Sequence, residues 1–143
     1  MRKSFLVLFE QLRNIMEYLG IDHIVLTVYS IQRSIEFYCA VLGMEEIAFG
    51  KGRKAIRCGN QKLNLHEVGK EIEPKALRPL PGSADICVIA TTPLKEVLKR
   101  LSLHQVHVLE GPVERTGAKG KILSIYFRDP DQNLLEISNQ LQS

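Results

Sequence analysis

A repeated order of one strand, one helix and three strands is the feature that most restricts how this chain can fold. In the first copy, the β-branched run 21–28 predicts a strand, and Ser30 can cap the helix predicted over 31–42. That helix has apolar side chains at helical spacing, and Gly43 lies just past its end. Three short strands are predicted at 45–49, 54–58 and 62–68. This order describes a small βαβββ module.

The same order begins again after a polar, proline-rich connector at 69–81. A strand is predicted at 84–90 and a helix at 94–103, whose apolar residues share one face. Three further strands are predicted at 106–110, 122–128 and 134–138, with a glycine-bearing loop at 111–121 between the first two. The chain therefore contains a second βαβββ module.

Two modules are too few for a solenoid, because a stacked array needs at least three repeats to bury its faces. They can instead set their sheets side by side, which gives a curved, partly open mixed sheet with a cleft. With 143 residues, 45% of them apolar, the chain has the size and composition of one soluble domain. We expect an α+β fold in which residues 19–143 form one domain, with modules at about 21–68 and 84–139.

The first 18 residues precede the repeat and differ from it in pattern. Basic residues stand before a short apolar run, but Glu10 and Arg13 interrupt that run, so neither a signal peptide nor a membrane span is expected. The apolar residues fall instead on one helical face: Phe5, Leu8, Phe9, Leu12 and Ile15. We expect residues 1–18 to form an amphipathic helix that packs on the domain or serves as a dimer arm.

Charge and cysteine usage exclude several classes of partner. The formal net charge is +3, but the basic residues are scattered among acids, whereas a nucleic-acid groove needs clustered positive charge. We expect no nucleic-acid partner and no membrane contact. The three cysteines are odd in number and lack CxxC spacing, which is typical of free thiols in a reducing compartment. A cytoplasmic location follows.

Three stretches, IDHIVLTV, SIEFYCAVLGM and FRDPDQNLLEIS, together with the repeat itself, resemble the vicinal oxygen chelate superfamily. This superfamily includes glyoxalase I, the bleomycin- and fosfomycin-resistance proteins and ring-cleaving dioxygenases. The resemblance is nearest to glyoxalase domain-containing proteins, some of them bacterial and labelled virulence proteins. It implies that His23 and Glu136 are metal ligands. Asp85 stands where the superfamily usually has a third, histidine ligand, and a carboxylate can still bind a divalent ion. One Ni, Zn, Mn or Mg ion per site is expected.

A fourth ligand is expected in the last strand of the first module, where glyoxalases have a glutamate or glutamine. Asn64 and His66 both qualify, because they are two residues apart in a strand and share a face. Neutral imidazole is the better ligand and favours His66, whereas the alignment of the modules favours Asn64. Asn64 is alternatively a residue that holds substrate or a metal-bound water.

Further substrate-binding candidates lie in the second module. Ser124 and Tyr126 share one face of the penultimate strand. Fosfomycin-resistance proteins are similar, since they hold the phosphonate of the drug with a serine and a tyrosine at the matching positions. Arg115 lies in the predicted 111–121 loop, from which it is placed to close over an anion.

The resemblance implies chemistry in which two adjacent substrate oxygens share one metal that stabilises developing negative charge. The first hypothesis is a metal-dependent lyase or isomerase of the lactoylglutathione lyase type, acting on a small oxygenated substrate with Glu136 as base. The alternatives are a fosfomycin-type resistance enzyme and a metal-free protein that binds a small molecule. A homodimer is expected, because each sheet has edges that need cover.

Overall fold

The computed structural model describes Val7 and residues 15–142. The first module contains a four-stranded mixed sheet in the order β1-β4-β3-β2, with β1 parallel to β4 and the other pairs antiparallel. Its helix begins as α-helix and continues as π-helix, which the sequence pattern did not predict. The elements are β1 (His23–Val28), α2 (Ile31–Ile35), η1 (Glu36–Val41), β2 (Glu45–Phe49), β3 (Arg53–Cys58) and β4 (Gln61–Glu67).

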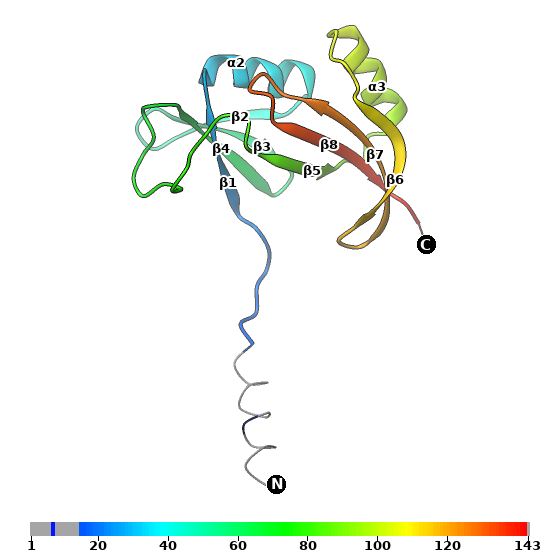
Figure 1. Ribbon diagram of the computed structural model, residues 1–143, viewed down its shortest axis with the longest axis horizontal. Helices are drawn as coiled ribbons and strands as arrows, with labels where there is room; N and C mark the ends of the chain where they lie inside the picture. Colours follow the sequence, from blue (N-terminus) through cyan, green and yellow to red (C-terminus); the bar gives the residue numbers. More distant parts are fainter. Residues whose placement is uncertain (1–6, 8–14, 143) are drawn as a thin grey trace.

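The second module repeats this topology, with the sheet order β5-β8-β7-β6 and β5 parallel to β8. Its elements are β5 (Asp85–Ile89), α3 (Leu94–Leu103), β6 (Glu110–Gly117), β7 (Gly120–Arg128) and β8 (Leu134–Gln140). The predicted α+β fold of two βαβββ modules is confirmed, and each module forms its own four-stranded sheet (Figure 1).

One part of the second module differs from the prediction. The stretch 111–121, predicted as a loop, is most of the hairpin formed by β6 and β7, whereas only Glu110 of the predicted strand 106–110 belongs to a strand. Pro112 is tolerated because β6 is an edge strand that needs hydrogen bonds on one side only. The apolar residues Val106 and Val108 pack against the core without joining a ladder.

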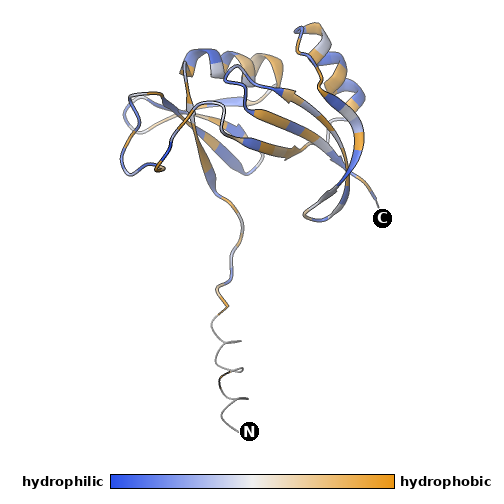
Figure 2. Ribbon diagram, in the orientation of Figure 1, coloured by the Kyte–Doolittle hydropathy of each residue, from blue (hydrophilic) through white to orange (hydrophobic). Residues whose placement is uncertain are grey.

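The core is shared by the two modules. One cluster of buried side chains joins Leu26 and Tyr38 of the first module to Leu101, Phe127 and Ile137 of the second. The strands alternate between hydrophobic and hydrophilic residues (Figure 2), as expected for sheets with one face packed on a core. Ser30 caps α2 as predicted, since its Oγ accepts a hydrogen bond from the Arg33 amide at 3.3 Å.

The turn between β7 and β8, which contains the DPDQN run, connects the modules. Tyr38 donates from its hydroxyl to Oδ2 of Asp129 at 2.7 Å, and the amide of Tyr29 donates to Oδ1 of Asp131 at 2.9 Å. Asn133 accepts at Oδ1 from the amide of Ala84 at 2.9 Å. These buried side chains therefore fix the first module and the connector on the second sheet.

Residues 15–22 form an arm without helix or strand that leads away from β1 (Figure 1). Most of the predicted N-terminal helix at 1–18 lies outside the described residues. Among the residues that the structure describes, none of the helices has the length and apolar character needed to cross a membrane.

Candidate functional site

Strand register relates the predicted ligands of one module to those of the other. In the first sheet Val25 is paired with Asn64, and in the second Cys87 is paired with Glu136, so Asn64 and Glu136 occupy equivalent positions. His23 and Asp85 each lie two residues before the strand residue of that pair, on the same face. We call His23 with Asn64 the first half-site, and Asp85 with Glu136 the second half-site.

The first half-site contains two donor atoms that suit a metal. His23 is partly exposed, and its Nδ1 lies 2.8 Å from Oδ1 of Asp22, which orients the ring and leaves Nε2 available as a ligand. Asn64 is 3% exposed, and its Oδ1 is buried without a hydrogen-bond partner among the described residues. An unpaired buried carbonyl oxygen destabilises the folded state. A hydrogen-bond donor from a ligand, or a bound cation, would offset this cost.

His66 has a different environment. It is paired in register with Thr27 and so corresponds to Ser138 of the second module rather than to Glu136. Its Nε2 lies 3.5 Å from Nη2 of Arg53. Burial and the positive charge of Arg53 lower the pKa of His66, and Glu71 opposes them, so the ring is neutral at neutral pH. The register therefore favours Asn64 over His66 as the counterpart of Glu136.

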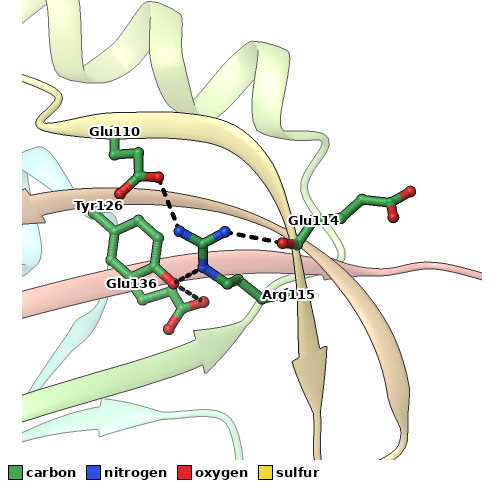
Figure 3. A network of polar contacts seen from close by, with 5 residues as sticks. All are labelled: Glu110, Glu114, Arg115, Tyr126 and Glu136. Atoms are coloured by element: carbon green, nitrogen blue, oxygen red, sulfur yellow. Dashed lines mark hydrogen bonds and ion pairs between the residues drawn. The ribbon is translucent and has the colours of Figure 1, made fainter.

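The second half-site is built around a hydrogen-bonded chain (Figure 3). Tyr126 donates from its hydroxyl to Oε1 of Glu136 at 2.9 Å, and Arg115 donates from Nε to the same hydroxyl at 3.1 Å. Arg115 is fixed in turn, because its Nη2 donates to Oε1 of Glu110 at 2.9 Å and its Nη1 to the carbonyl of Glu114 at 3.0 Å. Arg115 thus lies in strand β6 rather than in the predicted loop.

The electrostatics of this chain keep the Tyr126 hydroxyl protonated. The pKa of Tyr126 is raised, first by burial and then by its hydrogen bond to Glu136, while Arg115 acts in the opposite direction. Because the Arg115 donor faces the phenol oxygen, the phenol proton is directed to the Glu136 carboxylate. Among the described residues, no hydrogen bond reaches Oε2 of Glu136, so this oxygen is available to a metal or a substrate proton.

Ser124 is buried inside the second module. Its hydroxyl is fully buried and lies 2.7 Å from the hydroxyl of Ser138, which lies 3.5 Å from Oε1 of Glu136. Cys87 also contacts Ser138, at 3.5 Å. Ser124 therefore supports the strand that carries Glu136.

The two half-sites remain separate in one chain. Asp85 is exposed, and no hydrogen bond or ion pair involves its side chain among the described residues. Within Val7 and residues 15–142, no three side chains of histidine, cysteine, aspartate or glutamate come close enough to hold a metal ion. Each half-site has suitable donor chemistry, but a complete site requires that the two pairs meet.

Glu110 and Arg53 are among the network residues that were not predicted from the sequence. Glu110 meets Arg115 across an irregularity in the pairing of β6 with β7, which no spacing rule indicates. Arg53 approaches His66 because β3 and β4 form a hairpin. The predicted strand 54–58 began just after Arg53, and strand alternation does not separate a site residue from an exposed charge.

Comparison with known proteins places this fold and these motifs in a family. The sequence model of the Glyoxalase/Bleomycin resistance protein/Dioxygenase superfamily matches residues 20–137. The glyoxalase domain-containing protein RDO1 of Mycosarcoma maydis is 52% identical over 120 residues, which cover 84% of this chain and 68% of that protein. Virulence protein STM3117 of Salmonella typhimurium is 54% identical over 118 residues, which cover 82% of each.

Solved structures agree with these relationships. The crystal structure of STM3117 has a TM-score of 0.86 with this chain at 52% identity, and the alignment covers 88% of this chain and 100% of that one. A lactoylglutathione lyase from Agrobacterium tumefaciens has a TM-score of 0.66 at 23% identity, over 87% and 96% of the chains, which shows a shared fold. On its sequence, its two-module topology and the placement of its strand residues, this chain belongs to the Glyoxalase/Bleomycin resistance protein/Dioxygenase superfamily.

Proposed function

We propose that the protein is a metal-dependent lyase or isomerase of the lactoylglutathione lyase type, acting on a small oxygenated substrate. One observation carries this proposal: Glu136 is held through one carboxylate oxygen by Tyr126, at the position equivalent to the unpaired Oδ1 of Asn64. A carboxylate with one fixed and one open oxygen suits a group that binds a cation or moves a proton. Close relatives at 52% and 54% identity carry only glyoxalase-domain and virulence labels, so the reaction rests on this geometry.

The residues of the chain would divide the chemistry as follows. His23, Asn64, Asp85 and Glu136 would hold one divalent ion of the Ni, Zn, Mn or Mg group. The bound ion would supply Lewis acidity that stabilises negative charge on two adjacent substrate oxygens. When Oε2 is not engaged by the ion, Glu136 would use this oxygen to take a proton from the carbon beside a substrate carbonyl, while the Tyr126 hydroxyl keeps Oε1 fixed. Arg115 would hold the Tyr126 hydroxyl in its donating orientation.

We propose further that a second copy of the chain completes each site. The two half-sites do not converge within the described residues, and β1 and β5 are both unpaired edge strands. Large apolar side chains lie exposed on β5 and on the arm before β1, including Ile89, Tyr18 and Leu19. Exposed apolar surface beside sheet edges favours association with another chain. In the dimer, the first half-site of one subunit would face the second half-site of the other.

Mixing two inactive variants tests this arrangement. His23→Ala removes a first half-site and Glu136→Gln removes a second, so either homodimer would lack activity. After unfolding and refolding together, random pairing would restore about a quarter of the wild-type sites, since half of the dimers would be mixed and have one intact site of two. Recovery of hemithioacetal turnover on mixing, with none from His23→Ala alone, is expected. If each chain holds its own site, the mixture stays inactive.

Metal binding is tested without any substrate. Isothermal titration of Mn, Ni and Zn into the wild type should give about one ion per chain, and His23→Ala should weaken binding by at least about tenfold. His104→Ala is the matched control, because His104 is exposed at the end of α3 and far from the half-sites in sequence. Equal affinity of wild type and His23→Ala would remove this metal site.

A second candidate is a metal-free protein that binds a small molecule. The absence of any gathered ligand cluster among the described residues favours it. Sedimentation and elemental analysis together distinguish the two candidates. A dimer of about twice the 16.2 kDa chain that carries one metal ion per site would support the enzyme. We propose a cytoplasmic location for either function, since Cys39, Cys58 and Cys87 are free thiols.

A further inference from the structure

A cavity of about 520 Å³ lies between β1 and the connector that joins the two modules. Its lining includes Val25 and Thr27 of β1, His66 of β4, and residues of the segment 74–84, which contains the second part of the connector. Two hydrogen bonds shape this segment, from the amide of Leu80 to the Arg78 carbonyl at 3.0 Å and from the hydroxyl of Ser83 to the Leu80 carbonyl at 2.7 Å. Its end is tied to the turn between β7 and β8, because the amide of Ala84 donates to Oδ1 of Asn133 at 2.9 Å. The cavity is therefore a formed feature of the chain.

The charges around this cavity are one-sided. Lys75 and Arg78 are the charged residues of its lining, since His66 is neutral, and none of the described residues that line it is an aspartate or a glutamate. The Arg78 guanidinium forms no ion pair within the described part of the chain. Lys75 lies 3.8 Å from Glu71 and 3.6 Å from Glu73, which are long contacts for ion pairs. An unpaired guanidinium at a cavity is a good partner for a carboxylate, phosphate or sulfonate group.

Most of the remaining lining is apolar and open to solvent, and Thr27, Ser83 and Asn133 are its uncharged polar residues. Leu80 is 59% exposed, Val25 45% and Ile24 38%, although all three line the cavity. Pro79 and Ala76 add further apolar surface from the connector. A concave apolar surface with a few polar groups at one end is the usual form of a small-molecule site. It would bury the hydrocarbon part of a ligand whose acidic group lies at Arg78.

We infer that this cavity binds an amphipathic organic anion, with its acidic group held by Arg78 and Lys75 and its apolar body against Leu80 and Val25. The inference rests on the proposed function and deepens it, because the cavity reaches His66, two residues from Asn64 on the same face of β4. A substrate bound there extends toward the first half-site. The substrate class is therefore a carbonyl compound that carries both an acidic group and an apolar group.

Two related dyes test the charge requirement directly. 8-Anilinonaphthalene-1-sulfonate carries a sulfonate, and N-phenyl-1-naphthylamine is the same ring system without it. Both fluoresce on transfer from water to an apolar site. The wild type should bind the sulfonate dye at one site per chain, at least about tenfold more tightly than the neutral dye.

Variants then locate the site. Arg78→Ala should weaken binding of the sulfonate dye by at least about tenfold, because a charge-assisted contact is lost, and should leave binding of the neutral dye unchanged. Leu80→Ala should weaken both dyes. Lys99→Ala removes one positive charge from the exposed side of α3, away from the cavity, and should change neither. Arg78 and Leu80 are exposed, so their truncation should leave the fold intact.

Several outcomes would overturn the inference: equal binding of the two dyes, no binding of either, or equal effects of Arg78→Ala and Lys99→Ala. Manganese titration of the same variants separates this failure from failure of the proposed function. Arg78→Ala should retain wild-type metal affinity. If the wild type binds no metal but the dyes behave as expected, the proposed function fails and the anion site stands. If the wild type binds metal but Arg78→Ala leaves dye binding unchanged, only the proposed anion site is contradicted.

Discussion

The hydroxyl of Tyr126 donates to Oε1 of Glu136 over 2.9 Å, while Arg115 donates to that hydroxyl from the other side over 3.1 Å. The phenol is thus both a donor and an acceptor, and its proton points to Glu136. This arrangement separates the two oxygens of Glu136 into a fixed one and an available one. Each residue of this hydrogen-bonded network therefore has a role that a substitution can test.

Tyr126→Phe should lower turnover and preserve the fold. The phenyl ring keeps the packing, but Glu136 loses a donor, and a hydrogen bond to a charged group is worth about 1.5–3 kcal/mol. We expect kcat to fall about tenfold to a hundredfold with KM nearly constant, because the lost contact orients the base. Tyr29→Phe is the control, since the Tyr29 side chain is 63% exposed. A large rise in KM with constant kcat would instead assign Tyr126 to substrate binding.

Asp85→His should retain the metal and increase hemithioacetal turnover. A histidine ligand in place of a carboxylate leaves the ion with about one more unit of positive charge, which strengthens its Lewis acidity. Asp85 is exposed, so the larger side chain has room. Turnover is compared with wild type at matched metal occupancy. If this variant keeps its metal but loses an activity that wild type has, Asp85 acts as a base or a substrate anchor.

Gly82→Ala should destabilise the protein more than Gly69→Ala. The two glycines have nearly the same φ, +79° and +80°, so the cost of a left-handed side chain is about 1–2 kcal/mol at both. At Gly82 an added Cβ would also lie 2.7 Å from the carbonyl oxygen of Asp131, whereas at Gly69 nothing lies within 4 Å. Urea unfolding should show Gly82→Ala to be less stable by at least about 1 kcal/mol. Equal losses of stability in the two variants would show that the backbone around Gly82 shifts to accommodate the added Cβ.

The free energy of unfolding should fall above about pH 10 because of Tyr38. Burial, the charge of Asp129 and the hydrogen bond to it raise the pKa of this phenol far above its usual value. The unfolded chain therefore releases the proton first as pH rises, and stability present below pH 10 is lost at up to about 1.4 kcal/mol per pH unit. Tyr38→Phe should be less stable at pH 8 but should show a shallower slope between pH 10 and 11. Urea titrations at each pH measure both, and parallel slopes would contradict the assignment.

Much of the fold could be predicted because hydrophobic periodicity and turn residues agree in most segments. Helix 94–103 and strand 45–49 have the predicted bounds, since Pro93 precedes the helix and Gly43 and Gly50 flank the strand. Strand β6 was missed because glycine and proline indicate a loop, and only the sheet order shows that Pro112 lies on an edge. The π-helical part of η1 has no local signal, because its hydrogen bonds depend on packing.

The candidate site could be predicted only in part. The family resemblance indicated His23, Asp85 and Glu136, and it left Asn64 and His66 as alternatives, of which the register of β1 with β4 makes Asn64 the counterpart of Glu136. Strand alternation alone leaves two residues on one face equivalent. The contact of Arg115 with Glu110 depends on a local irregularity in strand pairing, which sequence spacing does not encode.

The DPDQN turn has a consequence for how this sequence signature should be interpreted. Every polar side chain that joins the modules there is already engaged: Asp129 by Tyr38 and by the amides of Asp131 and Asn133, and Asp131 by Tyr29. These two carboxylates are buried and hydrogen-bonded within the fold. A mutation there would damage assembly before it changed specificity. The most recognisable run of the chain therefore identifies the joint between its modules, and by itself it does not indicate a reaction.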